Sequence, residues 1–118
     1  MELRLKRVRD DAAESDGWRV LVDRLWPRGV TKERATLDAW AKDAAPSNDL
    51  RRQFHHDGLA WSEFERRYRA ELTGDAGSAA IAALRHELAE HAVVTLLYDA
   101  HDPEHNNAVI LADVLRAG

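Results

Sequence analysis

Two arginines lie in a polar segment that follows a predicted strand. The segment VLVDRLWPRG covers residues 20–29, and Arg24 and Arg28 come after its apolar residues. The planar guanidinium group can donate two parallel hydrogen bonds, which suits a phosphate or a carboxylate. Because α/β proteins gather ligand contacts where strands end, we expect Arg24 and Arg28 to hold an anion. The structural alternative is that Asp23 and Arg24 make ion pairs while the tryptophan and proline that follow pack a corner.

A second polar turn follows the apolar run 93–98. Asp102 is a favourable N-cap and Pro103 a favourable first helical residue, so a helix is predicted to begin there. We expect Tyr98, Asp102 and Asn106 to contact a ligand at this turn. The alternatives are that Tyr98 fills space, that Asp102 only caps the helix, and that one of the two adjacent asparagines holds the loop while the other faces the ligand.

Histidines near these turns are candidates for proton transfer. Imidazole titrates near neutral pH, so His56 or His105 could act as a general acid or base, although a capping or hydrogen-bonding role is the structural alternative. The pattern does not predict a metal site. His101 and His105 are four residues apart, but the predicted helix begins between them, and the adjacent His55 and His56 point apart in any regular structure.

Hydrophobic patterning predicts one α/β domain over residues 1–118. Apolar residues near 3–8 and 18–25 predict two strands, which a short polar loop joins as an antiparallel hairpin. The run 93–98 is typical of a strand in the interior of a sheet. Residues 37–43 suit either a short third strand or a helix, and we favour the strand. The predicted fold is therefore a small mixed, mostly parallel sheet with an N-terminal hairpin and helices packed on its faces.

Helical periodicity is clearest in the segment WSEFERRYRAEL, where an apolar stripe lies among charged residues. The members of this stripe are Trp61, Phe64, Tyr68 and Leu72. Four helices are predicted from residue 47 onward, and their expected N-caps are Ser47, Asp57, Ser78 and Asp102.

Composition excludes several classes of protein. The chain has no cysteine, which rules out disulfides, thiolate metal sites and a cysteine nucleophile. No stretch approaches the ~20 apolar residues of a membrane span, and the first ten residues lack the apolar core of a signal peptide, so we expect a cytoplasmic protein without a membrane partner. The net charge of −4 makes nucleic-acid binding a distant third function, although residues 1–34 are locally basic.

Five segments together resemble the YeaO-like branch of domain-of-unknown-function family 488. They are VDRLWPRG, APS at residues 45–47, FHHD at 54–57, WSEFERRYRAEL at 61–72 and TLLYDAHDPEHNNAVIL at 95–111. The resemblance implies an α/β fold with a cleft shared by the DRLWPRG and HDPEHN turns, and it supplies no activity. In the wider family the last strand leads into a cysteine-containing loop and a Cys-His-Arg turn. Here those positions look like Tyr98 and the turn at residues 105–107, without either cysteine.

These observations predict a protein that binds an anionic small molecule, a nucleotide or a phosphorylated metabolite, in a cleft at strand ends. Acid–base catalysis, any cofactor and the oligomeric state are left open by the sequence. The alternative is a noncatalytic interaction or structural module that uses edges bearing Trp26 and Trp40.

Overall fold

The computed structural model describes residues Met1 to Gly118 and contains one four-stranded sheet with five α-helices. In chain order the elements are β1 (Glu2–Arg7), the 3₁₀ helix η1 (Glu14–Asp16), β2 (Trp18–Leu21), α1 (Lys32–Ala35), β3 (Ala39–Trp40), the 3₁₀ helix η2 (Lys42–Ala44), α2 (Asn48–His55), α3 (Trp61–Thr73), α4 (Asp75–Leu88), β4 (Val93–Tyr98) and α5 (Asn107–Ala117). This arrangement confirms the α/β class, and no helix has the length and apolar character that a membrane span needs.

The strand β4 lies in the interior of the sheet, as its unbroken apolar run predicts. The strand order is β1-β4-β2-β3, and every pair is parallel. Both neighbours of β4 hydrogen-bond to it, and Val94 through Tyr98 are buried. The favoured strand within residues 37–43 is present but short, because β3 covers only two residues and η2 follows it.

The expected antiparallel hairpin is wrong, because β1 and β2 each pair in parallel with β4 and not with each other. The prediction assumed that a return connection needs a helix. However, β1 has six residues and is only about 20 Å long, so an extended loop of comparable residue number can reach back to the start of the sheet. Gly17 makes the last bend with a φ of +66°, where a Cβ atom would collide with the carbonyl oxygen of Val93.

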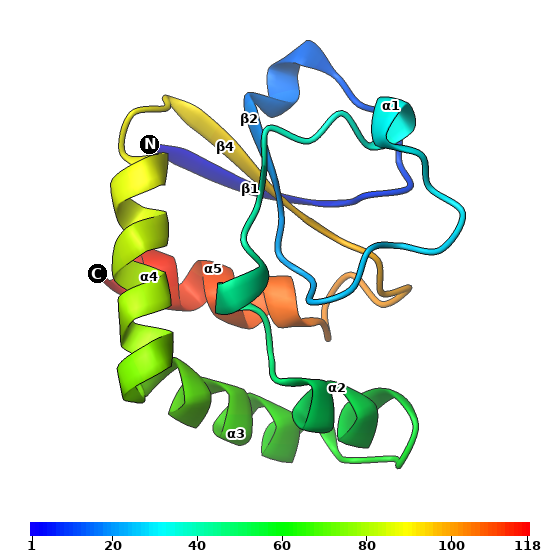
Figure 1. Ribbon diagram of the computed structural model, residues 1–118, viewed down its shortest axis with the longest axis vertical. Coiled ribbons are helices and arrows are strands. Elements are labelled where there is room, and N and C mark those ends of the chain that lie inside the picture. Colours follow the sequence, from blue (N-terminus) through cyan, green and yellow to red (C-terminus); the bar gives the residue numbers. More distant parts are fainter.

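The two faces of the sheet are covered differently. Leu96 belongs to the larger core, which α2, α3, α4 and α5 complete, whereas its neighbour Leu97 belongs to a smaller core with Ala35 of α1. Successive residues of a strand point to opposite faces, so these two cores lie on opposite sides of the sheet. Figure 1 shows α2 to α5 on one side of the strands and α1 in a separate corner.

The helix caps agree with the sequence at one position and differ at three. Ser47 caps α2 by accepting a hydrogen bond from the backbone N–H of Leu50, as predicted. The helix α3 begins after Ala60 and not after Asp57, and α4 begins at Asp75 and not at Ser78. Asp75 gains from the helix dipole in the first turn of α4, which explains the earlier start of that helix.

The last helix begins later than predicted. Asn106, and not Asp102, caps α5 by accepting a hydrogen bond from the N–H of Val109 at 3.1 Å. Asp102 instead accepts bonds from the N–H groups of Glu104 and His105 and so closes the preceding turn. Apolar burial starts only at Ala108, so a helical turn before Asn106 would have gained no contact with the core.

Candidate functional site

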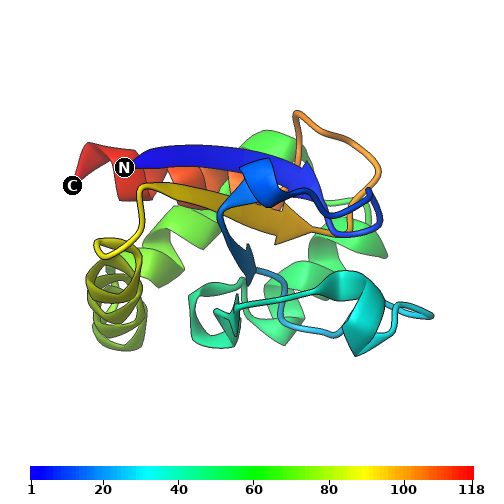
Figure 2. The same cartoon turned by 90° about the horizontal axis from the view of Figure 1, so that it is seen from above.

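A pocket of about 330 Å³ lies beyond the carboxyl ends of β2 and β4. Its walls come from residues 23–27 after β2, from residues 99–101 after β4, from α2 and from the start of α5. In Figure 2 the arrowheads of β1 and β4 point toward the same end of the molecule, where the loop after β4 lies. Parallel strands bring their carboxyl ends to one edge, which is why residues far apart in the chain meet here.

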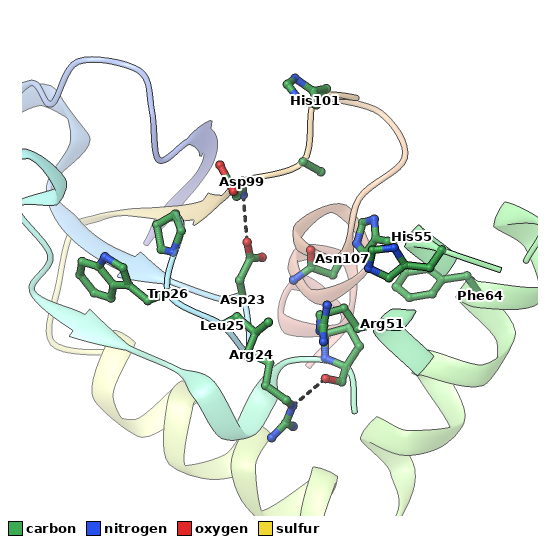
Figure 3. A pocket seen from close by; sticks show the side chains of 14 residues that line it. Asp23, Arg24, Leu25, Trp26, Arg51, His55, Phe64, Asp99, His101 and Asn107 are labelled. Carbon is green, nitrogen blue, oxygen red and sulfur yellow. Dashed lines mark hydrogen bonds between the residues drawn. The ribbon is translucent and has the colours of Figure 1, made fainter. Parts of the chain in front are cut away.

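Asp23 is the central acid of this pocket. Its Oδ2 accepts a hydrogen bond from the backbone N–H of Asp99 at 3.0 Å, which ties the two strand ends together (Figure 3). Burial raises the pKa of Asp23 from 3.8 to about 6, and the polar contacts with Asn107 and the Asp99 backbone oppose that rise. No ion pair compensates the Asp23 carboxylate.

Arg24 lines the pocket from the same segment. Its Nε donates to the carbonyl of Pro46 at 2.8 Å, and a terminal nitrogen donates to the carbonyl of Ala45 at 3.2 Å. These bonds fix the guanidinium group between β2 and the start of α2. The ion pairs that the structural alternative expected for Asp23 and Arg24 do not form, because Arg24 bonds to backbone carbonyls instead and Asp23 has no cationic partner.

Arg51 of α2 brings a second guanidinium group to the pocket wall. Its Nε is the one buried side-chain nitrogen or oxygen in the molecule without a hydrogen-bond partner. His55, four residues further along α2, also lines the pocket. Partial burial, followed by the charges of Arg51 and His56, lowers the pKa of His55. This wall of the pocket therefore has one guanidinium group, that of Arg51, that no acid of the chain neutralises, beside an imidazole whose lowered pKa favours the neutral form.

The two adjacent asparagines, Asn106 and Asn107, have different roles. Asn106 is 1% exposed, caps α5 and donates from Nδ2 to the carbonyl of Asp102 at 2.9 Å. Asn107 lines the pocket and donates to the carbonyl of Val22 at 2.9 Å. The expected division is therefore present, but Asn107 faces the pocket and Asn106 holds the loop.

Of the two histidines predicted to transfer protons, the structure brings only His56 to the pocket. The ring of His105 lies 4.9 Å from the ring of Trp61, and its Nδ1 lies 3.3 Å from an oxygen of Asp102. Both His105 and Asp102 are exposed and lie outside the pocket lining. The Asp102 carboxylate is therefore occupied within its own turn, by the backbone N–H groups of Glu104 and His105 and by the His105 ring.

Arg28 and Tyr98 also lie outside the pocket. Arg28 is exposed, and its carbonyl accepts a hydrogen bond from Arg9. Tyr98 is 4% exposed and belongs to the larger core, where its ring fills space. Both residues lie at or after the end of a strand, as predicted, but their side chains do not reach the cavity.

Sequence reasoning passed over Arg51 and gave Asp23 and His55 little weight. A usable signal was present, because Arg51 and His55 are four residues apart on a predicted helix and must share one face. For Asp23 the signal was its place directly after the apolar strand residues. The burial that distinguishes Asp23 comes from segments that are distant in the chain.

The fold and the pocket define a parallel α/β protein with a strand-end cavity, and the chain has no group of three or more acidic or histidine side chains placed to hold a metal ion. The family model described as the inactive DUF488-N3 subclade matches residues 2–118. The chain therefore belongs to this family, which confirms the resemblance seen in its segments.

Two relatives support the same assignment. The chain is 42% identical over 117 residues to the uncharacterized protein YeaO of Escherichia coli (strain K12), and the match covers 99% of both chains. It is 41% identical over 113 residues to an uncharacterized protein of Mycobacterium tuberculosis (strain ATCC 25618 / H37Rv), with 96% of this chain and 92% of the relative covered. No solved structure gives a significant match.

Proposed function

We propose that the pocket binds an anionic small molecule, a nucleotide or a phosphorylated metabolite. The observation that carries the proposal is the Arg51 guanidinium group, whose buried Nε has no partner within the chain. The Arg51 side chain makes no hydrogen bond or ion pair within the chain, so its terminal nitrogens, which are not buried, are free to donate to an anion in the pocket. Arg24 and His56 line the same pocket and add further donors.

The size and the place of the pocket agree with this proposal. About 330 Å³ falls within the range of small-molecule sites. The pocket also lies beyond the carboxyl ends of parallel strands, where α/β proteins bind their ligands. Binding without turnover is the form of the proposal that suits the description of the family as an inactive subclade.

Calorimetry with inorganic phosphate, pyrophosphate and sulfate tests the proposal. We expect Arg51→Gln to weaken binding of these anions at least tenfold. Arg52→Gln is the matched control, because Arg52 is the next residue of α2, is exposed and pairs with Asp49 outside this pocket. Arg28→Ala is a second control that should leave affinity unchanged. Equal losses in Arg51→Gln and Arg52→Gln, or no binding of any anion by the unaltered protein, would contradict the proposal.

A second candidate is a noncatalytic interaction module. Leu25, in the segment after β2, is 50% exposed, and Trp40 of β3 is 37% exposed. Trp40 donates from Nε1 to the carbonyl of Asp23 at 2.7 Å, which places it beside the pocket. Light scattering after size exclusion tests this candidate with a second copy as the partner, because a tryptophan-lined interface should give a dimer that Trp40→Ser abolishes.

A further inference from the structure

The pocket has an aromatic wall as well as a cationic one. Trp26 lines it, and the Nε1 of Trp26 is already committed to the carbonyl of Val30 at 2.7 Å. The ring of Trp40 braces the Trp26 ring edge-on, with centroids 5.6 Å apart and planes at 71°. Trp26 therefore brings to the pocket an aromatic ring in a fixed position, and an aromatic ring can stack a flat ligand ring.

A carboxylate lies between the aromatic and the cationic walls. In Figure 3, Trp26 lies on one side of Asp23, and Arg51, His55 and Phe64 lie on the other. One oxygen of Asp23 accepts the N–H of Asp99, so the carboxylate keeps acceptor capacity beyond that bond. The Asp23 carboxylate weakens the binding of a ligand that is only an anion. A ligand with an N–H or O–H group near its middle would be held by it.

We infer that the ligand is a nucleoside monophosphate, an inference that rests on the proposed function. The base stacks on Trp26, a base N–H or a ribose hydroxyl donates to Asp23, and the phosphate accepts hydrogen bonds from Arg51. A nucleoside monophosphate carries a flat ring, polar hydrogens and one terminal anion in the order in which the pocket presents its three partners. One phosphate suffices, because Arg51 and Arg24 are the only arginines that line the pocket.

The first experiment is a ligand series on the unaltered protein. Inorganic phosphate, ribose 5-phosphate, and the 5′-monophosphates of adenosine, guanosine, cytidine and uridine are titrated by calorimetry at one ionic strength. We expect the nucleotides to bind at least tenfold more tightly than ribose 5-phosphate, since base stacking on an aromatic side chain is strong and tolerates different bases.

The second experiment removes the aromatic wall. Trp26→Leu should reduce the nucleotides to the affinity of ribose 5-phosphate and leave the binding of phosphate unchanged. Trp18→Leu is the matched control, because Trp18 begins β2 at the opposite end of the strand and stacks on His91. The ligand series on the unaltered protein decides the question even if Trp26→Leu does not fold.

A third variant separates the role of the acid. Asp23→Asn should tighten the binding of inorganic phosphate, because a negative charge leaves the pocket. It should also reduce the ratio of nucleotide affinity to phosphate affinity, because the acceptor for the base or ribose is weakened. If phosphate, ribose 5-phosphate and nucleotides bind equally well, the inference fails while anion binding stands. If none of these probes binds, both this inference and the proposed function fail.

Discussion

The strand β2 has an aspartate at each end, and the two carboxylates have opposite surroundings. Asp16, just before the strand, accepts hydrogen bonds from Arg19 at 2.5 Å, from Lys6 at 3.1 Å and from the N–H of Ala13 at 3.0 Å. Burial raises the pKa of Asp16, but these donors together outweigh it and hold the pKa below its usual value. Asp23, just after the strand, has no cationic partner, and its pKa rises to about 6.

The arginines show the same contrast. The guanidinium group of Arg19 bonds to Asp16 and to the carbonyls of Thr36 and Ala35, so its donors are used within the chain. The Nε of Arg51 is buried without a partner. Arg19 and Asp16 neutralise each other within the framework, whereas Arg51 and Asp23 line the pocket without a counter-charge, which makes the pocket a candidate ligand site.

The largest expected effect is on the satisfied cluster. Arg19→Met leaves the buried Asp16 carboxylate with Lys6 as its one remaining cation and removes the donors of the Ala35 and Thr36 carbonyls. We expect the free energy of unfolding to fall by about 3–5 kcal/mol, which urea denaturation measures. Adding Asp16→Asn to this variant should recover part of the loss. A change below about 1 kcal/mol in Arg19→Met would remove the distinction between the two clusters.

The next effect has the opposite sign and depends on pH. The folded pKa of Asp23 lies above its unfolded value, so the unaltered protein loses stability as pH rises from 3.8 through about 6. Asp23→Asn removes that cost, and we expect a gain of up to about 3 kcal/mol at pH 7 that vanishes near pH 4. Urea denaturation at both pH values measures it. If the stability difference between Asp23→Asn and the unaltered protein is the same at pH 4 and pH 7, Asp23 does not titrate between these pH values.

Anion binding should also depend on pH. Below about pH 6 Asp23 loses its negative charge, and His55, whose pKa is lowered, gains a proton only under more acidic conditions than usual. Both changes favour an anion, so we expect sulfate, whose charge is constant in this range, to bind on the order of tenfold more tightly at pH 5 than at pH 7.5. In Asp23→Asn, calorimetry should give a flatter profile and tighter binding at pH 7.5. A profile as steep as that of the unaltered protein would exclude Asp23 as a source of the dependence.

The smallest effect concerns the unsatisfied arginine. Arg51→Met removes a buried donor that has no partner, so we expect the free energy of unfolding to stay within about 1 kcal/mol of that of the unaltered protein or to rise. This is the counterpart of Arg19→Met, with the same substitution in the other environment. A loss comparable to that of Arg19→Met would show that Arg51 stabilises the fold, and its role in the pocket would need another argument.

Local patterns predicted several elements correctly. The run 93–98 is an interior strand because apolar residues on both faces need cover from both sides. The stripe of Phe64, Tyr68 and Leu72 lies in the core because helical periodicity places these residues on one face. Arg24 and His56 line the pocket, and their roles in binding and in proton transfer stay predictions.

Other features depended on contacts that no local pattern contains. The pairing of β1 with β4 joins residues about ninety positions apart, for example Arg7 and Tyr98. The start of α5 depends on where core burial begins, and the exclusion of Arg28 and His105 from the pocket depends on side-chain direction. These are decided when the whole chain packs.

The sequence by itself determined the α/β class, the central strand, the amphipathic helices and the polar character of the two strand-end turns, because periodicity and residue type act over a few neighbouring residues. Only the tertiary structure decided which charges are satisfied. Asp16 and Asp23 have the same side chain and flank the same strand. They differ because Lys6 and Arg19 reach one carboxylate, while the other is enclosed beside Asp99 and Asn107 without a cation.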